Sequence, residues 1–294
     1  MGRVEEHMLP QYVALVSETG NVDYPALAPV AGAIQKQVTR DFEPIWGINA
    51  VIAAYPTLED VPLGYWPVII KDDIGQPGAA GIHLDDNHQP FSLVQFSNHW
   101  SLTASHECLE MLADPYGNRV VASDSIKQGQ GRVEYLVEVC DPSEAEAYAY
   151  TVNAVQVSDF YTPRYFDPVA SQGVQYSFTG KITEPRQVLP GGYLSWHDPT
   201  DDHWYQARYF TQRVRIVDLG VFDAGVKSLR AEMDKRSFRR EWVANFPAKS
   251  SALVAARAAE TRTEPAKRSK AAAWRAQIAA LTAEANATGA KRSR

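Results

Sequence analysis

The stretch SLTASHECLEMLADPYG, residues 101–117, predicts the helix on which the fold and function of this chain depend. Leu102, Leu109 and Leu112 give it an apolar side, and Pro115 marks its end. The polar residues between them allow two interpretations. They belong either to a metal site or to the solvated face of an ordinary amphipathic helix.

His106 and Glu107 begin like the zinc-protease signature H-E-x-x-H, but Glu110 stands where the second histidine belongs. Residues i and i+4 share one face of a helix, so His106 and Glu110 can direct an imidazole nitrogen and a carboxylate oxygen to one ion. Glu107 lies about 100° further round the helix and can reach a water molecule beside that ion. This is the position of the general base in a metallohydrolase. Cys108 is expected to face the core.

A third ligand is available in RVEYLVEVCDPSEAEAY, residues 132–148, which contains several carboxylates in a strand-like context. Glu138 interrupts the apolar run, and a carboxylate near a core is costly unless a metal or a donor pairs with it. Glu138 is therefore the first candidate for the third ligand, and Asp141 is the alternative.

Asp114 is a competing acidic residue on the helix itself. It follows His106 by eight residues, a rise of about 12 Å, which is too far for both to bind one ion. We assign Asp114 to hydrogen bonding at the helix end or to the shell of residues that orients the ligands.

Other histidines and tyrosines have weaker signals. Hydrolysis needs a donor that stabilises the oxyanion, and the candidates, for which core packing is the alternative, are Tyr161, Tyr165, His197 and His203. We expect three other histidines near the helix at surface or turn positions: His83, His88 and His99.

The surrounding pattern predicts a mixture of helices and strands. Residues 24–47 carry apolar side chains at spacings of three and four, which predicts an amphipathic helix. Short apolar or β-branched runs then predict strands, the last two joined by a polar turn, at residues 49–56, 65–73, 82–84 and 91–96. Similar runs between residues 151 and 220, broken by Pro and Gly, predict a β-rich second lobe.

The 294 residues are 45% hydrophobic and 22% charged, which is typical of a globular protein of one large or two smaller domains. No apolar run approaches the roughly 18 residues that a membrane span needs, and the first residues lack the apolar stretch of a signal peptide. Cys108 and Cys140 are too few for a disulfide framework. We expect a soluble, cytoplasmic protein with reduced thiols and no membrane partner.

The end of the chain differs in charge from the rest. Residues 251–294 contain nine Lys or Arg residues and three Glu, a net charge of +6, whereas residues 1–250 carry −12. This alanine-rich segment has few large apolar side chains, which predicts a partly helical, flexible tail. It could contact nucleic acid, an acidic partner or the acidic body of the protein, and solvated disorder is the alternative.

The order of elements over residues 28–114 resembles the catalytic half of zincin metallopeptidases. More narrowly, SHECLEMLADP with the later EVCDPSE is similar to a zincin-like group of largely uncharacterised bacterial proteins with H-E-x-x-E-x-x-x-D-P and E-x-x-D motifs. The resemblance implies an α+β fold with a mixed sheet, an active-site helix, and an edge strand within residues 81–96 that pairs with an extended substrate. Together with the strand pattern and the charge of the tail, it leads us to expect three parts: a zincin-like catalytic lobe, a β-rich second lobe ending in a helix, and a basic tail, at residues 1–150, 151–246 and 247–294.

One histidine with two carboxylates puts more negative charge on an ion than two histidines with one carboxylate, so the ion should be a weaker Lewis acid. Zn²⁺ is the expected metal, and Mn²⁺ or another divalent ion is the alternative. Three functions remain open. The first is a metal-dependent hydrolase, a zinc metallopeptidase-like protein that acts on a peptide or protein through a metal-activated water and Glu107. The others are a catalytically inactive zincin-fold structural or binding protein with a structural metal, and a nucleic-acid-associated protein that uses the basic tail.

Overall fold

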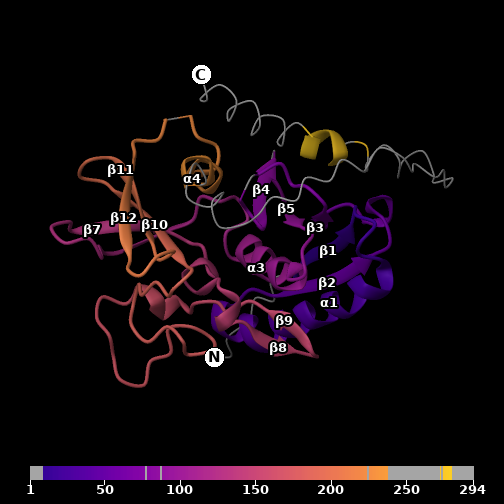
Figure 1. Cartoon of the computed structure of the whole chain (residues 1–294), viewed down its shortest axis with the longest axis horizontal. Coiled ribbons are helices and arrows are strands. Elements are labelled where there is room, and N and C mark those ends of the chain that lie inside the picture. The colour runs from indigo at the N-terminus through magenta and orange to yellow at the C-terminus, as the bar shows by residue number, and fades with distance from the viewer. Residues whose placement is uncertain are drawn as a thin grey trace, which may run out of the picture.

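The protein has an α+β fold, as the order of predicted elements indicates. The computed structural model describes residues 9–76, 78–86, 88–223, 225–237, 272 and 274–279. In the view of Figure 1, helix α3 (Trp100–Ala113) lies between two five-stranded sheets. Within the described ranges, no helix is both long enough and apolar enough to cross a membrane.

The first sheet is mixed, in the order β2-β1-β3-β5-β4. Four strands run parallel, and β4 pairs antiparallel with β5 at the edge. The central strands are continuously buried over most of their length, as is typical of parallel strands covered on both faces, and they are almost wholly apolar there. The strands are β1 (Gln11–Ser17), β2 (Ala50–Tyr55), β3 (Trp66–Lys71), β4 (Gly81–Asp86) and β5 (Gln89–Gln95).

Helices α1 and α3 cover one face of this sheet. Helix α1 (Tyr24–Gln37) starts where the Asp23 side chain accepts a hydrogen bond from the Ala26 N–H at 3.0 Å. It continues through a π-helical turn (Val38–Phe42) into α2 (Glu43–Trp46). The run ends at Gly47, whose φ of 69° lies in the left-handed region that favours glycine. The apolar side chains of α1 and α3 meet those of β1 and β3 in the main core.

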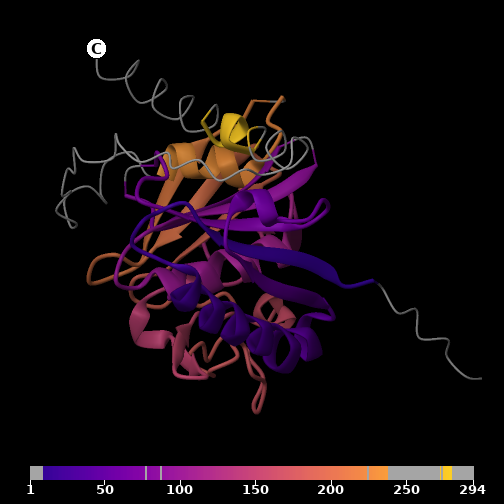
Figure 2. The same cartoon turned by 90° about the vertical axis from the view of Figure 1, so that its right-hand side faces the viewer.

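The described part of the C-terminal segment covers the opposite face of the sheet. Trp274 is buried against Phe91, with the two ring centroids 5.9 Å apart. Arg275 pairs with Glu18 at 2.8 Å and with Glu59 at 2.6 Å. This part of the basic segment therefore contacts acidic side chains within residues 1–250. Figure 2 shows the short helix, drawn in yellow, on the side of the sheet away from α1. The remainder of the predicted tail lies outside the described residues.

The second sheet is antiparallel, in the order β12-β11-β10-β7-β6. It combines two strands that precede residue 150 with three that follow residue 190, so it crosses the expected boundary between the two lobes. Its strands are β6 (Val120–Asp124), β7 (Arg132–Leu136), β10 (Tyr193–Asp198), β11 (His203–Arg208) and β12 (Arg215–Gly220).

Short elements connect the sheets. The hairpin of β8 (Tyr150–Val152) and β9 (Val155–Val157) packs against α1 and α3, and α4 (Leu229–Ser237) follows the second sheet. Single 3₁₀ turns occupy Leu58–Asp60, Asp141–Ser143, Glu146–Tyr148 and Pro163–Phe166. The chain between β7 and β8 therefore runs from the second sheet back beneath α3.

A buried hydrogen-bond network fixes α3 relative to α1 and β9. The Gln37 amide donates to the Ser158 carbonyl at 2.9 Å and accepts from the Ser105 hydroxyl at 2.7 Å. The Ser105 hydroxyl in turn accepts from the Ser158 N–H at 3.0 Å. Every member is satisfied by the others, so the network orients α3 without leaving a buried polar group unpaired.

We expect Gln37→Ala to lower the free energy of unfolding by about 1–3 kcal/mol, because the Ser158 carbonyl and the Ser105 hydroxyl each lose a buried partner. Urea denaturation measures the change. Lys36→Ala is the matched control, since Lys36 bonds the Asn153 side chain at the exposed surface, and it should change stability by less than about 0.5 kcal/mol. Equal effects for the two variants would contradict the role of the network.

Candidate metal centre

The acidic residues of α3 face the interior of the protein. His106 is 8% exposed, Glu107 3% and Glu110 0%. Ionised carboxylates are costly in such a setting unless charges or donors surround them. The interpretation of these residues as a solvated polar face is therefore wrong, and the helix presents them to a built site.

The His106 ring meets two carboxylates. Its Nε2 lies 3.4 Å from Glu110 Oε1, as the i, i+4 spacing predicts, and 3.1 Å from Asp141 Oδ1. Glu144 completes a group with His106 and Asp141 whose ligand atoms all lie within 4.8 Å of one another. Of the two carboxylates considered for the third ligand, Asp141 is the one beside His106. Glu144 was not selected from the sequence, although it lies one turn beyond Asp141.

Glu138 points to a different partner. It is 2% exposed, and its Oε1 lies 3.1 Å from Arg230 Nε, while the Ser195 hydroxyl donates to Oε2 at 3.1 Å. The structure thus brings Glu138 into the same acidic cluster but beside a cation, not beside His106. The expectation that this carboxylate needs a strong partner is met by Arg230 and Ser195.

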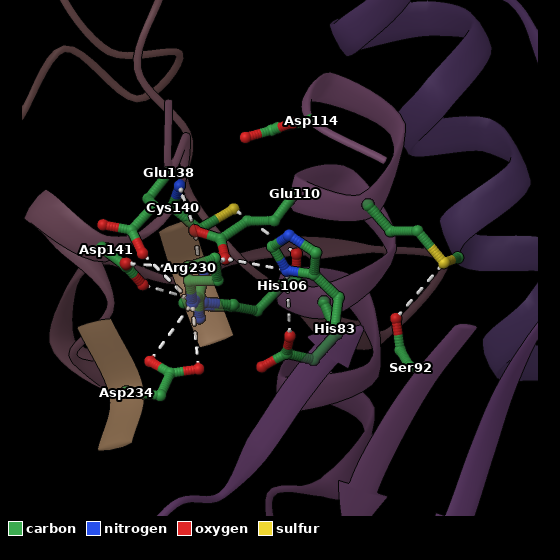
Figure 3. Close-up of polar contacts among 12 residues, drawn as sticks. His83, Ser92, His106, Glu110, Asp114, Glu138, Cys140, Asp141, Arg230 and Asp234 are labelled. Atoms are coloured by element: carbon green, nitrogen blue, oxygen red, sulfur yellow. Dashed lines mark hydrogen bonds and ion pairs between the residues drawn. The ribbon is translucent and has the colours of Figure 1, made fainter. Parts of the chain in front are cut away.

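Arg230 of α4 reaches the centre of this cluster and is 3% exposed. Its guanidinium lies 2.7 Å from Glu110, 3.1 Å from Glu138, 3.3 Å from Asp234 and 3.9 Å from Asp141. Figure 3 shows the four carboxylates around it. No local pattern identifies this residue, because it follows Glu110 by 120 positions and belongs to a highly polar helix.

The charges in the cluster shift each other's pKa. Burial lowers the pKa of His106, but the Glu110 charge and its neighbours outweigh this and raise it well above its usual range. Burial would raise the pKa of Glu110, yet His106 and Arg230 hold it well below its usual range. Burial, with nearby carboxylates, raises the pKa of Glu138 and Glu144 well above theirs. The cluster therefore holds more acidic groups than its own cations neutralise.

An open hollow of about 100 Å³ gives access to the centre, and its lining includes Gly81, His106, Glu107, Glu144, Tyr193 and Arg230. Gly81 is required where β4 passes α3, since a Cβ there would lie 2.6 Å from Glu107 Oε1 and 2.7 Å from the Thr103 methyl. The edge strand and the helix thus approach closely at the mouth of the hollow.

His83 was expected at the surface, and this is wrong: its side chain is 2% exposed. Its Nδ1 lies 3.7 Å from Glu107 Oε2 and 3.6 Å from Glu110 Oε2. The alternation of β4 was the signal that could have located it. Ile82 and Leu84 join the core on one face of the sheet, so His83 faces α3 on the other. His88 and His99 are exposed, as predicted.

Asp114 ends α3 and bonds the chain that follows. Its carboxylate accepts from the Asn118 N–H at 3.1 Å and from the Arg119 N–H at 2.8 Å. Figure 3 places Asp114 apart from the carboxylates around Arg230. Hydrogen bonding at the helix end is therefore the role found for Asp114.

None of the four candidates for an oxyanion donor is among the residues that line the hollow. Tyr161 and Tyr165 are stacked in the core with centroids 4.3 Å apart. His197 contacts Glu134 and Asp202, and His203 contacts Asp218. Among the described residues that line the hollow, Tyr193 is the one that carries a phenol hydroxyl.

The donor set fits a divalent ion. Both oxygens of Asp141, Glu144 Oε1 and Glu107 Oε2 are buried without a hydrogen-bond partner. Two ligand atoms bound at about 2.1 Å with tetrahedral angles lie roughly 3.4 Å apart, which matches the separations around His106 Nε2. Imidazole with carboxylates is a set that Zn²⁺ and Mn²⁺ accept.

No family model, curated protein or solved structure matches this chain. Its function is therefore argued from the chemistry of the site alone.

We expect Arg230→Met to destabilise the protein by about 3–5 kcal/mol, because it leaves several buried carboxylates without their cation. Chemical denaturation without added metal measures the change. Arg164→Met is the control, since the Arg164 side chain is 61% exposed in its pair with Asp167, and it should cost less than about 1 kcal/mol. A loss below 1 kcal/mol in Arg230→Met would show that Arg230 is not a principal counter-ion of the cluster.

The two free thiols, Cys108 and Cys140, are 1% and 0% exposed. Burial raises the pKa of Cys108 to about 12, and burial also raises the pKa of Cys140 well above its usual range. A buried thiol with a raised pKa is a poor nucleophile, because the thiolate is the reactive form. We expect no reaction with an aromatic disulfide reagent in the native state and labelling of both thiols in denaturant. Labelling of the native protein within minutes would contradict the buried placement.

Proposed function

We propose that this protein is a metal-dependent hydrolase of the zincin type that binds a divalent ion between His106, Glu110 and Asp141, with Glu144 beside them. The observation that carries the proposal is that Glu110 Oε1 and Asp141 Oδ1 lie 3.4 Å and 3.1 Å from His106 Nε2. The surroundings of Asp141 support it: apart from the His106 ring, the nearest cation to this buried carboxylate among the described residues is Arg230, at 3.9 Å from Oδ2, and a buried carboxylate needs donors or a cation.

Zn²⁺ is the proposed ion, with Mn²⁺ as the alternative. When bound, such an ion supplies Lewis-acid chemistry: it polarises a carbonyl group and makes water more acidic. The surplus of carboxylates over histidines weakens this effect, so we expect slower turnover than a site with two histidines provides.

Glu107 is the proposed general base. It lines the hollow next to His106, and its Oε1 lies toward Gly81, which lines the same hollow. A carboxylate in that position accepts a proton from water in the hollow and returns it to the leaving amine. Tyr193 also lines the hollow, and its phenol hydroxyl is the proposed donor to the oxyanion.

A peptide or protein is the proposed substrate class. Strand β4 is at the sheet edge, so its outer backbone groups can pair with an extended chain. Its first residue, Gly81, and the preceding Ala79 and Ala80 line the hollow. A peptide that continues the sheet along β4 therefore carries its backbone carbonyls past His106 and Glu107.

One observation favours a second candidate, a zincin-fold protein with a structural metal and no turnover. Arg230 and Tyr193 border the same hollow as His106. A metal enclosed by such groups, without room for a substrate carbonyl, stabilises the fold and does not catalyse.

Three variants separate the candidates. For an enzyme, Glu107→Gln should retain metal at the His106 site and lose about 10²–10⁴-fold in hydrolysis of fluorescent casein and quenched peptide libraries. His106→Ala and Asp141→Ala should lose the metal of the His106 site, one equivalent less than in the unaltered protein, together with the activity. Metal content is measured by elemental analysis of protein purified without chelator.

The remaining outcomes decide against the enzyme. Bound zinc with no cleavage by the unaltered protein, and equal thermal stability for Glu107→Gln, would support the structural metal. No bound metal after addition of Zn²⁺ or Mn²⁺ would overturn both candidates.

A further inference from the structure

His83 is a buried imidazole whose two ring nitrogens both lack a hydrogen-bond partner. It projects from β4 toward α3 and is 2% exposed. Burying a polar ring without any partner is unfavourable by several kcal/mol on the cyclohexane scale and by about 1–3 kcal/mol in proteins. The residue needs a ligand or a donor that the hydrogen bonds of the fold do not provide.

Two carboxylate oxygens face this histidine. Nδ1 lies 3.7 Å from Glu107 Oε2 and 3.6 Å from Glu110 Oε2, and the ligand atoms of the three residues lie within 4.8 Å of one another. Hydrogen bonds of this kind are shorter, at about 2.7–3.2 Å. Atoms that share one ion at about 2.1 Å are roughly 3.4–3.7 Å apart for angles near 110–120°. The separations therefore fit a shared cation better than direct hydrogen bonds.

We propose that His83, Glu107 and Glu110 bind a second divalent ion, and that Glu110 bridges it to the ion at His106. The bridge follows from the two oxygens of this carboxylate, since Oε1 lies 3.4 Å from His106 Nε2 and Oε2 lies 3.6 Å from His83 Nδ1. The proposal rests on the proposed function for the first ion and extends it to a two-metal centre. Imidazole with carboxylates again selects Zn²⁺ or Mn²⁺.

The cluster contains more carboxylates than cations, so a further positive ion is electrostatically favourable there. Among the described residues, Arg230 is the permanent cation of this cluster. Five carboxylates of the cluster are at most 3% exposed: Glu107, Glu110, Glu138, Asp141 and Asp234. Arg230 Nη1 also donates to Glu110 Oε2 at 2.7 Å. A carboxylate oxygen has two lone pairs, so this bond and a metal contact are compatible.

The second ion leaves a role for Glu107. Its Oε2 is turned to His83, whereas its Oε1 lies toward Gly81, which lines the hollow. The oxygen on the side of the hollow is free to exchange a proton with water there. Paired ions about 3.5–4 Å apart are common in hydrolases, where they hold the attacking and leaving oxygens.

The test counts ions on the full-length chain by native mass spectrometry during titration with Zn²⁺ and, separately, Mn²⁺. We expect two ions in the unaltered protein and one in His83→Leu, which fills the ring's space without a ligand atom. His106→Ala should also retain one ion. His99→Ala is the control and should retain two, because His99 is exposed beside Glu146.

A second measurement needs no variant. The electron paramagnetic resonance spectrum of the manganese-loaded protein should show the exchange coupling of two bridged ions, whereas isolated ions give uncoupled spectra. This answer stands even if His83→Leu does not fold.

The outcomes separate the two proposals. One ion in both the unaltered protein and His83→Leu, with an uncoupled spectrum, would overturn the second site and leave the first intact. Two ions retained in His83→Leu would place the second ion elsewhere and overturn the proposal. No ion in the unaltered protein would remove both sites.

Discussion

The burial of acidic side chains beside α3 is the constraint on which the rest of the structure depends. Each unpaired charge in a protein interior costs several kcal/mol, so the carboxylates of this cluster determine which elements must meet. Helix α3 supplies Glu107 and Glu110, the turn after β7 supplies Asp141, and α4 supplies Arg230. The three elements meet at this cluster, where the Arg230 guanidinium lies 2.7 Å from Glu110 and 3.9 Å from Asp141.

This requirement couples the two sheets. The chain leaves the second sheet at β7 and places Asp141 beneath α3, while the Arg230 N–H donates to the Gly117 carbonyl at 2.9 Å and so fixes α4 to the segment after α3. The proposed ligands come from the region before residue 150, but the arginine that balances them follows the second sheet. The site is therefore incomplete without the part of the chain that the sequence suggested as a separate lobe.

Local patterns were sufficient for much of this. The helical spacing located α3 and paired His106 with Glu110, and the order of strands indicated the α+β class. The choice between Glu138 and Asp141 depended on the path of a turn after β7, which no periodicity describes. Arg230 could not be predicted, because its contact with Glu110 joins residues 120 positions apart and no local sequence pattern indicates such a contact. The burial of His83 could have been predicted, since the alternation of side chains along β4 directs it to the covered face of the sheet.

Anomalous X-ray diffraction from crystals of the zinc-loaded protein, recorded on both sides of the zinc absorption edge, tests the central claim most directly. The account predicts an anomalous peak within bonding distance, about 2.0–2.2 Å, of His106 Nε2 and an Asp141 oxygen. Absence of any peak at the cluster, with the Arg230 guanidinium alone among the carboxylates, would show that the acidic groups are neutralised by protons and arginine and that the metal centre does not exist.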